Sequence, residues 1–117
     1  MIFTGFYEDH QKYSLLKNSF AFIHLSLYEG FGISPIEALR AKIPVILHKN
    51  PVYEELFNEV AIMVNGLDAK EVGDTIYDVF KNSKKYSDRV DDGYKLSKRH
   101  TWENVARSTH EVFKEIV

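Results

Sequence analysis

The chain has 117 residues, 44% of them hydrophobic, and it contains no cysteine. This size corresponds to one domain, and the lack of cysteine excludes disulfide-stapled folds and thiolate metal sites. With 15 basic and 17 acidic residues the net charge is −2, so no general positive field attracts nucleic acid or anionic membranes. The apolar runs are far shorter than the roughly 20 residues that span a bilayer, and the N-terminus lacks a signal-peptide pattern. We therefore expect a soluble, cytoplasmic domain.

The first half of the sequence alternates short apolar runs with helical segments. The runs have strand length and lie at residues 2–6, 20–25, 43–47 and 60–64. Continuous apolar character is typical of parallel strands covered on both faces. Helices are predicted at 9–18, 35–41 and 51–58, the last two beginning with proline, which suits a first helical turn. The alternation predicts an α/β domain with a parallel sheet of about four strands and flanking helices.

The last third is predicted to be helical. Asp68 and Glu71 have the spacing of a capping box, and apolar residues then recur on one helical face. A charged helix follows over 84–99, and Thr101 caps a final helix with an apolar face. Acids are interleaved with the lysines of this region, so we interpret its basic clusters as solvated helix faces rather than phosphate contacts.

Residues 26–39 carry the strongest indication of chemistry. They leave the C-terminal end of a predicted strand and enter a helix, which is where α/β sheets bind ligands. Gly30 and Gly32 allow the backbone to approach a ligand or to adopt positive φ. The N–H groups and dipole of the following helix N-terminus favour an anion, and a nucleotide diphosphate suits this geometry.

Several side chains of this region are candidates for function. Glu29 and Glu37 can accept hydrogen bonds from sugar hydroxyls. Glu37 also completes a capping box with Ser34, so a structural role stays open for it, whereas Glu29 caps no predicted helix. We expect the Phe31 side chain to plug the loop from below and its N–H to face the ligand. His24 is either a hydrogen-bonded core residue, the favoured interpretation, or a functional group near the strand end.

The segment 26–39, which includes Tyr-Glu-Gly-Phe-Gly, resembles the signature of the retaining, nucleotide-sugar-dependent glycosyltransferases called group 1 or family four. Glu29 and Glu37 are separated by seven residues, as in the paired-glutamate motif of that family. Further resemblances lie along the chain, at residues 3–6, 43–46 and 101–103. The resemblance implies the C-terminal, donor-binding part of an enzyme with two Rossmann-like domains that face a cleft, the GT-B architecture.

The resemblance also implies roles for individual residues. Glu29 would be the catalytic residue, contacting the transferred sugar and helping to stabilise the oxocarbenium-like transition state, and Glu37 would hold the ribose hydroxyls. Backbone N–H groups would lie against the sugar and phosphates of the donor at Gly30, Phe31, Gly32 and Ile33. The family needs no metal or other cofactor, and the histidines here lack metal-binding spacing.

The sequence departs from the family pattern at several points. Leu25 stands where proline is frequent, and the loop over residues 48–54 lacks the usual glycine pair, although Glu54 or Glu55 can supply its usual acid. The arginine and lysine that neutralise the leaving diphosphate in relatives have no counterpart. We therefore expect weak binding of a nucleotide and poor catalysis by the isolated chain.

The resemblance covers only the latter part of such an enzyme. Residues 1–117 are therefore expected to form a partial donor-nucleotide-binding domain, without the acceptor-binding domain and the first two donor-domain strands. In a sheet ordered 3-2-1-4-5-6 the missing strands lie between those at 2–6 and 20–25. The first strand is then expected to close up beside the second, to swap onto another copy or to pair with a complementing N-terminal chain, so homo-oligomers are expected. The alternative to a glycosyltransferase fragment is a non-catalytic nucleotide- or partner-binding module, a split or truncated transferase half.

Overall fold

Three parallel strands organise the chain in the computed structural model, which describes residues 1–117. They are β1 (Phe22–His24), β2 (Val45–His48) and β3 (Ile62–Val64), and they lie in the order β1-β2-β3. Phe22 is in register with Val45, and Ile46 with Ile62. The predicted α/β class with a parallel sheet is therefore confirmed, with three strands.

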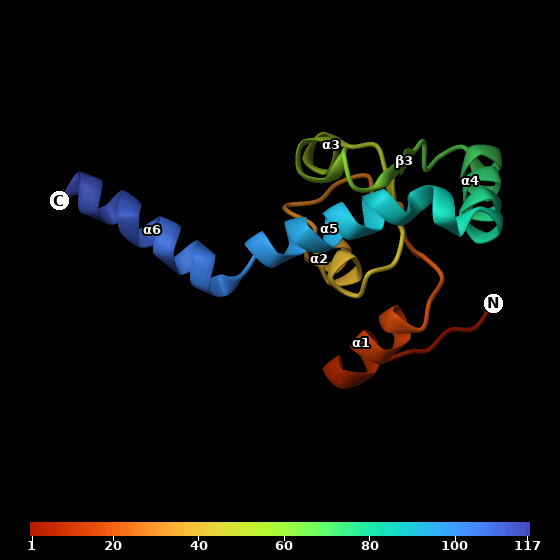
Figure 1. Cartoon of the computed structure of the whole chain (residues 1–117), viewed down its shortest axis with the longest axis horizontal. Helices are drawn as coiled ribbons and strands as arrows, with labels where there is room; N and C mark the ends of the chain where they lie inside the picture. Colours follow the sequence, from red (N-terminus) through yellow and green to blue (C-terminus); the bar gives the residue numbers. More distant parts are fainter.

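Helices follow each strand and then make up the rest of the chain (Figure 1). They are α1 (Asp9–Lys17), α2 (Ile33–Arg40), α3 (Pro51–Phe57), α4 (Ala69–Lys81), the 3-10 helix η1 (Ser83–Tyr86), α5 (Ser87–Arg99) and α6 (Trp102–Ile116). The predicted caps at Asp68 and Thr101 are confirmed, since each side chain accepts a hydrogen bond from a backbone N–H of its helix. Glu71 does not close the predicted capping box, because its carboxylate accepts from the N–H of Asn65 instead.

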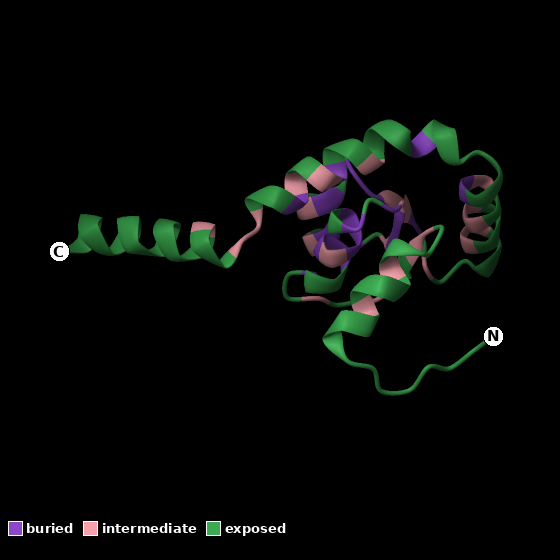
Figure 2. Cartoon of the chain, turned by 60° about the horizontal axis from the view of Figure 1, so that its bottom comes forward, coloured by how far each residue is buried: buried purple, intermediate pink, exposed green.

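The core lies on both faces of β2. Val45 and Leu47 point to the face covered by α2 and α3, where Leu39 and Phe57 complete the larger cluster. Ile46 points to the other face and packs in a smaller cluster formed with residues of β3, α4 and η1. Such alternation follows from the period of two along a strand. Figure 2 shows the buried residues gathered in this central part of the chain.

Two expectations about the edge of the sheet are wrong. Residues 1–8 form no strand, and Ile2 and Phe3 are almost fully exposed, because no strand lies beside them to accept and donate the backbone hydrogen bonds that a strand needs. The run 20–25 is not covered on both faces either. β1 pairs only with β2, and Phe20 and Ile23 are exposed.

Helix α6 projects away from the rest of the molecule (Figures 1 and 2). It contains no buried residue, and its predicted apolar face, which includes Trp102, Phe113 and Ile116, is exposed. No helix of the structure combines the length and the apolar character needed to cross a membrane.

The contact between α5 and α2 depends on Gly93. A Cβ atom at this position would lie 2.5 Å from Cδ2 of Leu39, whose side chain is buried. Overpacking of a core costs about 1–3 kcal/mol, while alanine in place of glycine gains up to about 1 kcal/mol of helix propensity. We therefore expect G93A to lower the free energy of unfolding by about 1 kcal/mol net.

A second helical glycine provides the matched control. Gly73 lies in α4, and a Cβ atom there would meet nothing within 4 Å. G73A should therefore raise the free energy of unfolding by about 0.5–1 kcal/mol through helix propensity alone. Urea denaturation followed by circular dichroism measures both variants. Equal stabilisation of G73A and G93A would show that the α5–α2 contact tolerates a methyl group.

Candidate functional site

The loop over residues 25–32 joins β1 to α2 and enters the helix through Gly32. This glycine is the N-cap of α2 and has a φ of 101°. The predicted capping box of Ser34 and Glu37 is therefore wrong, because the helix begins at Ile33, ahead of Ser34. A structural role for Glu37 as a cap is thereby removed.

Gly32 also lies in close contact with α3. A Cβ atom there would be 2.9 Å from Cε1 of Tyr53 and 3.1 Å from Cε2 of Phe57, and both aromatic side chains are buried. At Gly30, by contrast, a Cβ atom would meet nothing within 4 Å. The loop therefore packs against α3 at Gly32, whereas Gly30 has no close neighbours.

Four backbone N–H groups at the entrance to α2 are free of backbone acceptors. Those of Gly30, Phe31, Gly32 and Ile33 donate no hydrogen bond to a backbone acceptor. The Phe31 side chain does not plug the loop from below as expected. It is 42% exposed, and its ring centroid lies 5.6 Å from that of His100, just beyond α5.

Glu29 lies at the end of a chain of polar contacts. Its Oε1 is 3.3 Å from Nε2 of His24, the last residue of β1. Nδ1 of the same imidazole is 3.3 Å from the hydroxyl of Tyr53 on α3. His24 is hydrogen-bonded as expected, but it is not the core residue that was favoured, because its side chain is 34% exposed. Its contacts connect it directly to a candidate site residue.

Tyr53 is fully buried. Burial, and next the negative charge of Glu29, raises the pKa of its hydroxyl to about 12. The hydroxyl therefore stays protonated at neutral pH. Tyr53 also donates its backbone N–H to Oδ1 of Asn50 at 2.9 Å.

Asn50 ties α3 to the loop. Its side chain caps α3 and donates from Nδ2 to the carbonyl oxygen of Ser26 at 3.1 Å. Neither Asn50 nor Tyr53 was predicted to be part of the site. An asparagine before a proline is a recognisable start of a helix, but no local pattern indicates the contacts of either residue with the loop.

Glu37 has a different environment. Its Oε1 lies 2.7 Å from Nζ of Lys12 on α1, and both side chains are about one-third exposed. The hydrogen bond to Glu37 is the main reason that the pKa of Lys12 is raised. Lys12 was not predicted as part of the site. No hydrogen bond or ion pair joins Glu37 to Glu29, and the two acids share no partner.

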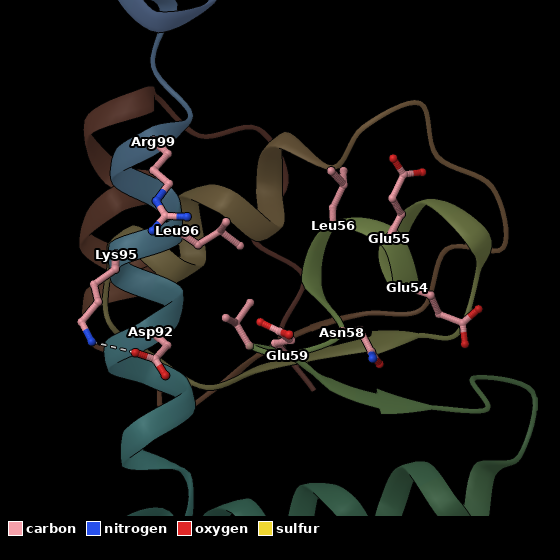
Figure 3. Close-up of a pocket in the computed structure, with 10 residues that line it drawn as sticks. Glu54, Glu55, Leu56, Asn58, Glu59, Asp92, Lys95, Leu96 and Arg99 are labelled. Carbon is pink, nitrogen blue, oxygen red and sulfur yellow. Dashed lines mark hydrogen bonds and ion pairs between the residues drawn. The ribbon is translucent and has the colours of Figure 1, made fainter.

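A pronounced groove of the surface lies elsewhere. It is a groove of about 600 Å³ whose lining comes from α3, α5 and the turn after α3, and it contains none of residues 26–39 (Figure 3). Glu54 and Glu55 line it together with Lys95, which pairs with Asp92 at 2.7 Å. The two acids proposed for the loop after β2 therefore line a different surface from Glu29.

No three histidine, aspartate or glutamate side chains are grouped so as to hold a metal ion.

Comparison with known proteins gives a consistent result. The family described as glycosyl transferases group 1 matches residues 1–96. The O-antigen chain mannosyltransferase RfbU of Salmonella typhimurium is 41% identical over 56 residues, which cover 48% of this chain and 16% of that protein. The serotype-specific mannosyltransferase WbdA of Escherichia coli is 25% identical over the whole chain, which spans 14% of its length.

Among solved structures, the N-terminal domain of trehalose-6-phosphate phosphatase from Candida albicans superposes with a TM-score of 0.84. The match covers 98% of this chain and 26% of that chain, at 18% sequence identity. At this identity the likeness shows the fold alone.

Proposed function

Because the chain belongs to the group 1 glycosyl transferases, we propose that the loop from Ser26 to Glu37 binds the sugar nucleotide that donates the sugar in a retaining transfer to a hydroxyl group. The observation that carries the proposal is the combination of unpaired N–H groups at residues 30–33 with a half-buried carboxylate, that of Glu29, beside them. Unpaired N–H groups at a helix N-terminus favour phosphate, and a carboxylate accepts hydrogen bonds from sugar hydroxyls.

Glu29 has the properties required of the sugar contact. One carboxylate oxygen faces His24, and the side chain keeps 24% of its surface exposed, where a sugar hydroxyl can reach it. A carboxylate held at a fixed position also stabilises positive charge that develops on the sugar ring in the transition state. Glu37 is proposed to hold the ribose. Its Oε1 is paired with Lys12, so that Oε2 is the oxygen left for a hydroxyl group.

The relatives suggest which sugar to test first. RfbU and WbdA are both mannosyltransferases, and we therefore propose a hexose donor with mannose as the leading candidate. Residues 1–117 are proposed to act as the donor-nucleotide-binding part. Lys12 is paired with Glu37, the proposed ribose contact, and does not replace the arginine and lysine that neutralise the leaving diphosphate in relatives. Removing such cationic stabilisation lowers the rate by roughly 10³–10⁵. We expect donor binding without efficient transfer by this chain alone.

Isothermal titration of the chain with GDP-, UDP- and ADP-linked hexoses and with the free nucleotides tests the proposal. At least one sugar nucleotide should bind more tightly than its free nucleotide. E29Q should remove that difference, because a hydrogen bond to a charged group contributes about 1.5–3 kcal/mol, or roughly 10- to 150-fold in affinity.

The groove between α3 and α5 supplies the control. Glu54 is exposed and lines that groove, so E54Q should bind every compound like the unmodified chain. If no sugar nucleotide binds, or if E54Q and not E29Q lowers the affinity, the assignment of the donor to the loop is wrong. Binding of a free nucleotide alone would favour the non-catalytic module.

A further inference from the structure

Glu29 lies in a loop that gives it little support of its own. Its neighbour Tyr28 is 91% exposed, and Gly30 has open space around it. The Glu29 carboxylate contacts Nε2 of His24 through Oε1 at 3.3 Å, and it also lies close enough to the hydroxyl of Tyr53 to raise the pKa of that group. The position of this carboxylate therefore depends on the imidazole and on Tyr53, which contacts the same imidazole.

His24 is itself held on two sides. Its backbone is in register with Leu47 of the buried central strand, which fixes where the side chain starts. Its Nδ1 meets the hydroxyl of Tyr53, a residue with no exposed surface. No other titratable side chain is within hydrogen-bond or ion-pair distance of the ring.

The tautomer of His24 sets the direction of these bonds, and the geometry favours one tautomer. A phenol that stays protonated donates its hydrogen to Nδ1, and a neutral imidazole that accepts at Nδ1 carries its proton on Nε2. That N–H then donates to the acceptor-only carboxylate of Glu29. An imidazole with its proton on Nδ1 would place two acceptors, Nε2 and Oε1, against each other.

We propose that His24 is a positioning residue that holds the Glu29 carboxylate toward the sugar of the donor, with Tyr53 fixing the imidazole tautomer that makes this bond possible. The inference rests on the proposed function, because it concerns the same contact with the sugar. Its physical logic is that of a metal-bound or catalytic histidine, whose orientation is set by the partner of its second nitrogen. In this site the imidazole of His24, once oriented by Tyr53, orients the carboxylate of Glu29.

The tautomer can be measured without any ligand. Long-range ¹H–¹⁵N correlation spectra of the ¹⁵N-labelled chain, with His24 assigned by its loss in H24Q, should show the proton on Nε2 and an acceptor nitrogen at Nδ1. In Y53F the Nδ1 resonance should move and the tautomers should mix. A proton on Nδ1 in the unmodified chain, or a His24 spectrum that Y53F leaves unchanged, would overturn the proposed role of Tyr53.

Titration calorimetry tests the consequence for binding. H24A should lower the affinity for the best-bound hexose nucleotide about tenfold, in line with the loss of one hydrogen bond to a charged group, and leave the free nucleotide unaffected. H24Q should restore most of the affinity, because its amide retains an N–H donor. A merely structural role would lower both affinities together, with no rescue by glutamine.

His48 provides the matched control. It ends the neighbouring strand β2 and accepts from the N–H of Gly66 at 2.8 Å, away from the Glu29 contact. H48Q should bind the hexose nucleotide like the unmodified chain. If a hexose nucleotide binds and H24A does not weaken it, the positioning role is wrong while the proposed function stands. If none binds, the proposed function fails, and the tautomer spectra still decide whether Tyr53 and His24 orient Glu29.

Discussion

Replacing Gly32 with alanine is expected to lower the free energy of unfolding by about 3 kcal/mol, a large share of the total for a domain of this size. Two costs combine. A residue other than glycine at a φ of 101° costs about 1–3 kcal/mol. The added Cβ would also lie 2.9 Å and 3.1 Å from the rings of Tyr53 and Phe57, and these buried rings have little space to move.

Thermal denaturation followed by circular dichroism should show this as a decrease in the melting temperature of roughly 10 °C. Gly30 serves as the control, because it is two residues away in the same loop, has no positive φ and has open space around it. G30A should change the melting temperature little. If both variants lower the melting temperature equally, the loop is sensitive to any added side chain, and the contact of Gly32 with α3 is not the cause.

The order of elements could be predicted from the sequence because the strongest signals are local. Val45 to Leu47 form a continuous apolar run, and the structure buries all three residues at the centre of the sheet. The caps at Asp68 and Thr101 are also local, since each side chain bonds to an N–H two or three residues later. Interactions of this range are fully visible in a short window of sequence.

The edge of the sheet could not be predicted in this way. Phe20 and Ile23 are as apolar as the residues of β2, but coverage depends on whether another element lies over them. Phe20 instead contacts Phe80 of α4, with ring centroids 5.5 Å apart. Residues 2–6 have strand propensity without a neighbouring strand, and propensity alone does not form a strand.

In the candidate site, too, the features that are local in sequence could be predicted and the long-range contacts could not. The motif predicts that Glu29 precedes and Glu37 lies within α2, and the structure agrees. Glu29 has a partner near in sequence, His24, but the partners of Glu37 and of His24 come from far along the chain. Lys12 is 25 residues from Glu37, and Tyr53 is 29 residues from His24, so only the packing of α1 and α3 brings them together. The start of α2 was misplaced for a related reason, because Ser34 and Gly32 both suit a cap locally and the contact of Gly32 with α3 is a tertiary feature.

Tyr53 should also make the folded chain sensitive to high pH. Its hydroxyl has a pKa of about 12 in the folded state, mainly because of burial, against 10 for an ordinary tyrosine. Between these values the unfolded chain loses this proton and the folded chain keeps it, so the free energy of unfolding falls as the pH rises from about 10 to 12. The contribution of Tyr53 is fully present below pH 10. A shift of this size corresponds to a loss on the order of 2 kcal/mol.

Urea denaturation at pH 8, 10 and 11.5 measures this dependence. Y53F has no ionisable hydroxyl at this position, so its stability should fall less between pH 10 and 11.5 than that of the unmodified chain. The comparison uses the difference between pH values, because Y53F also loses the bond to His24 at every pH. Tyr77 of α4 is 64% exposed, and Y77F should keep the pH dependence of the unmodified chain. If the stability of Y53F falls with pH as steeply as that of the unmodified chain, the Tyr53 hydroxyl ionises in the folded state as readily as in the unfolded state. The hydrogen bond from Tyr53 to His24 would then be lost at high pH without cost to the fold.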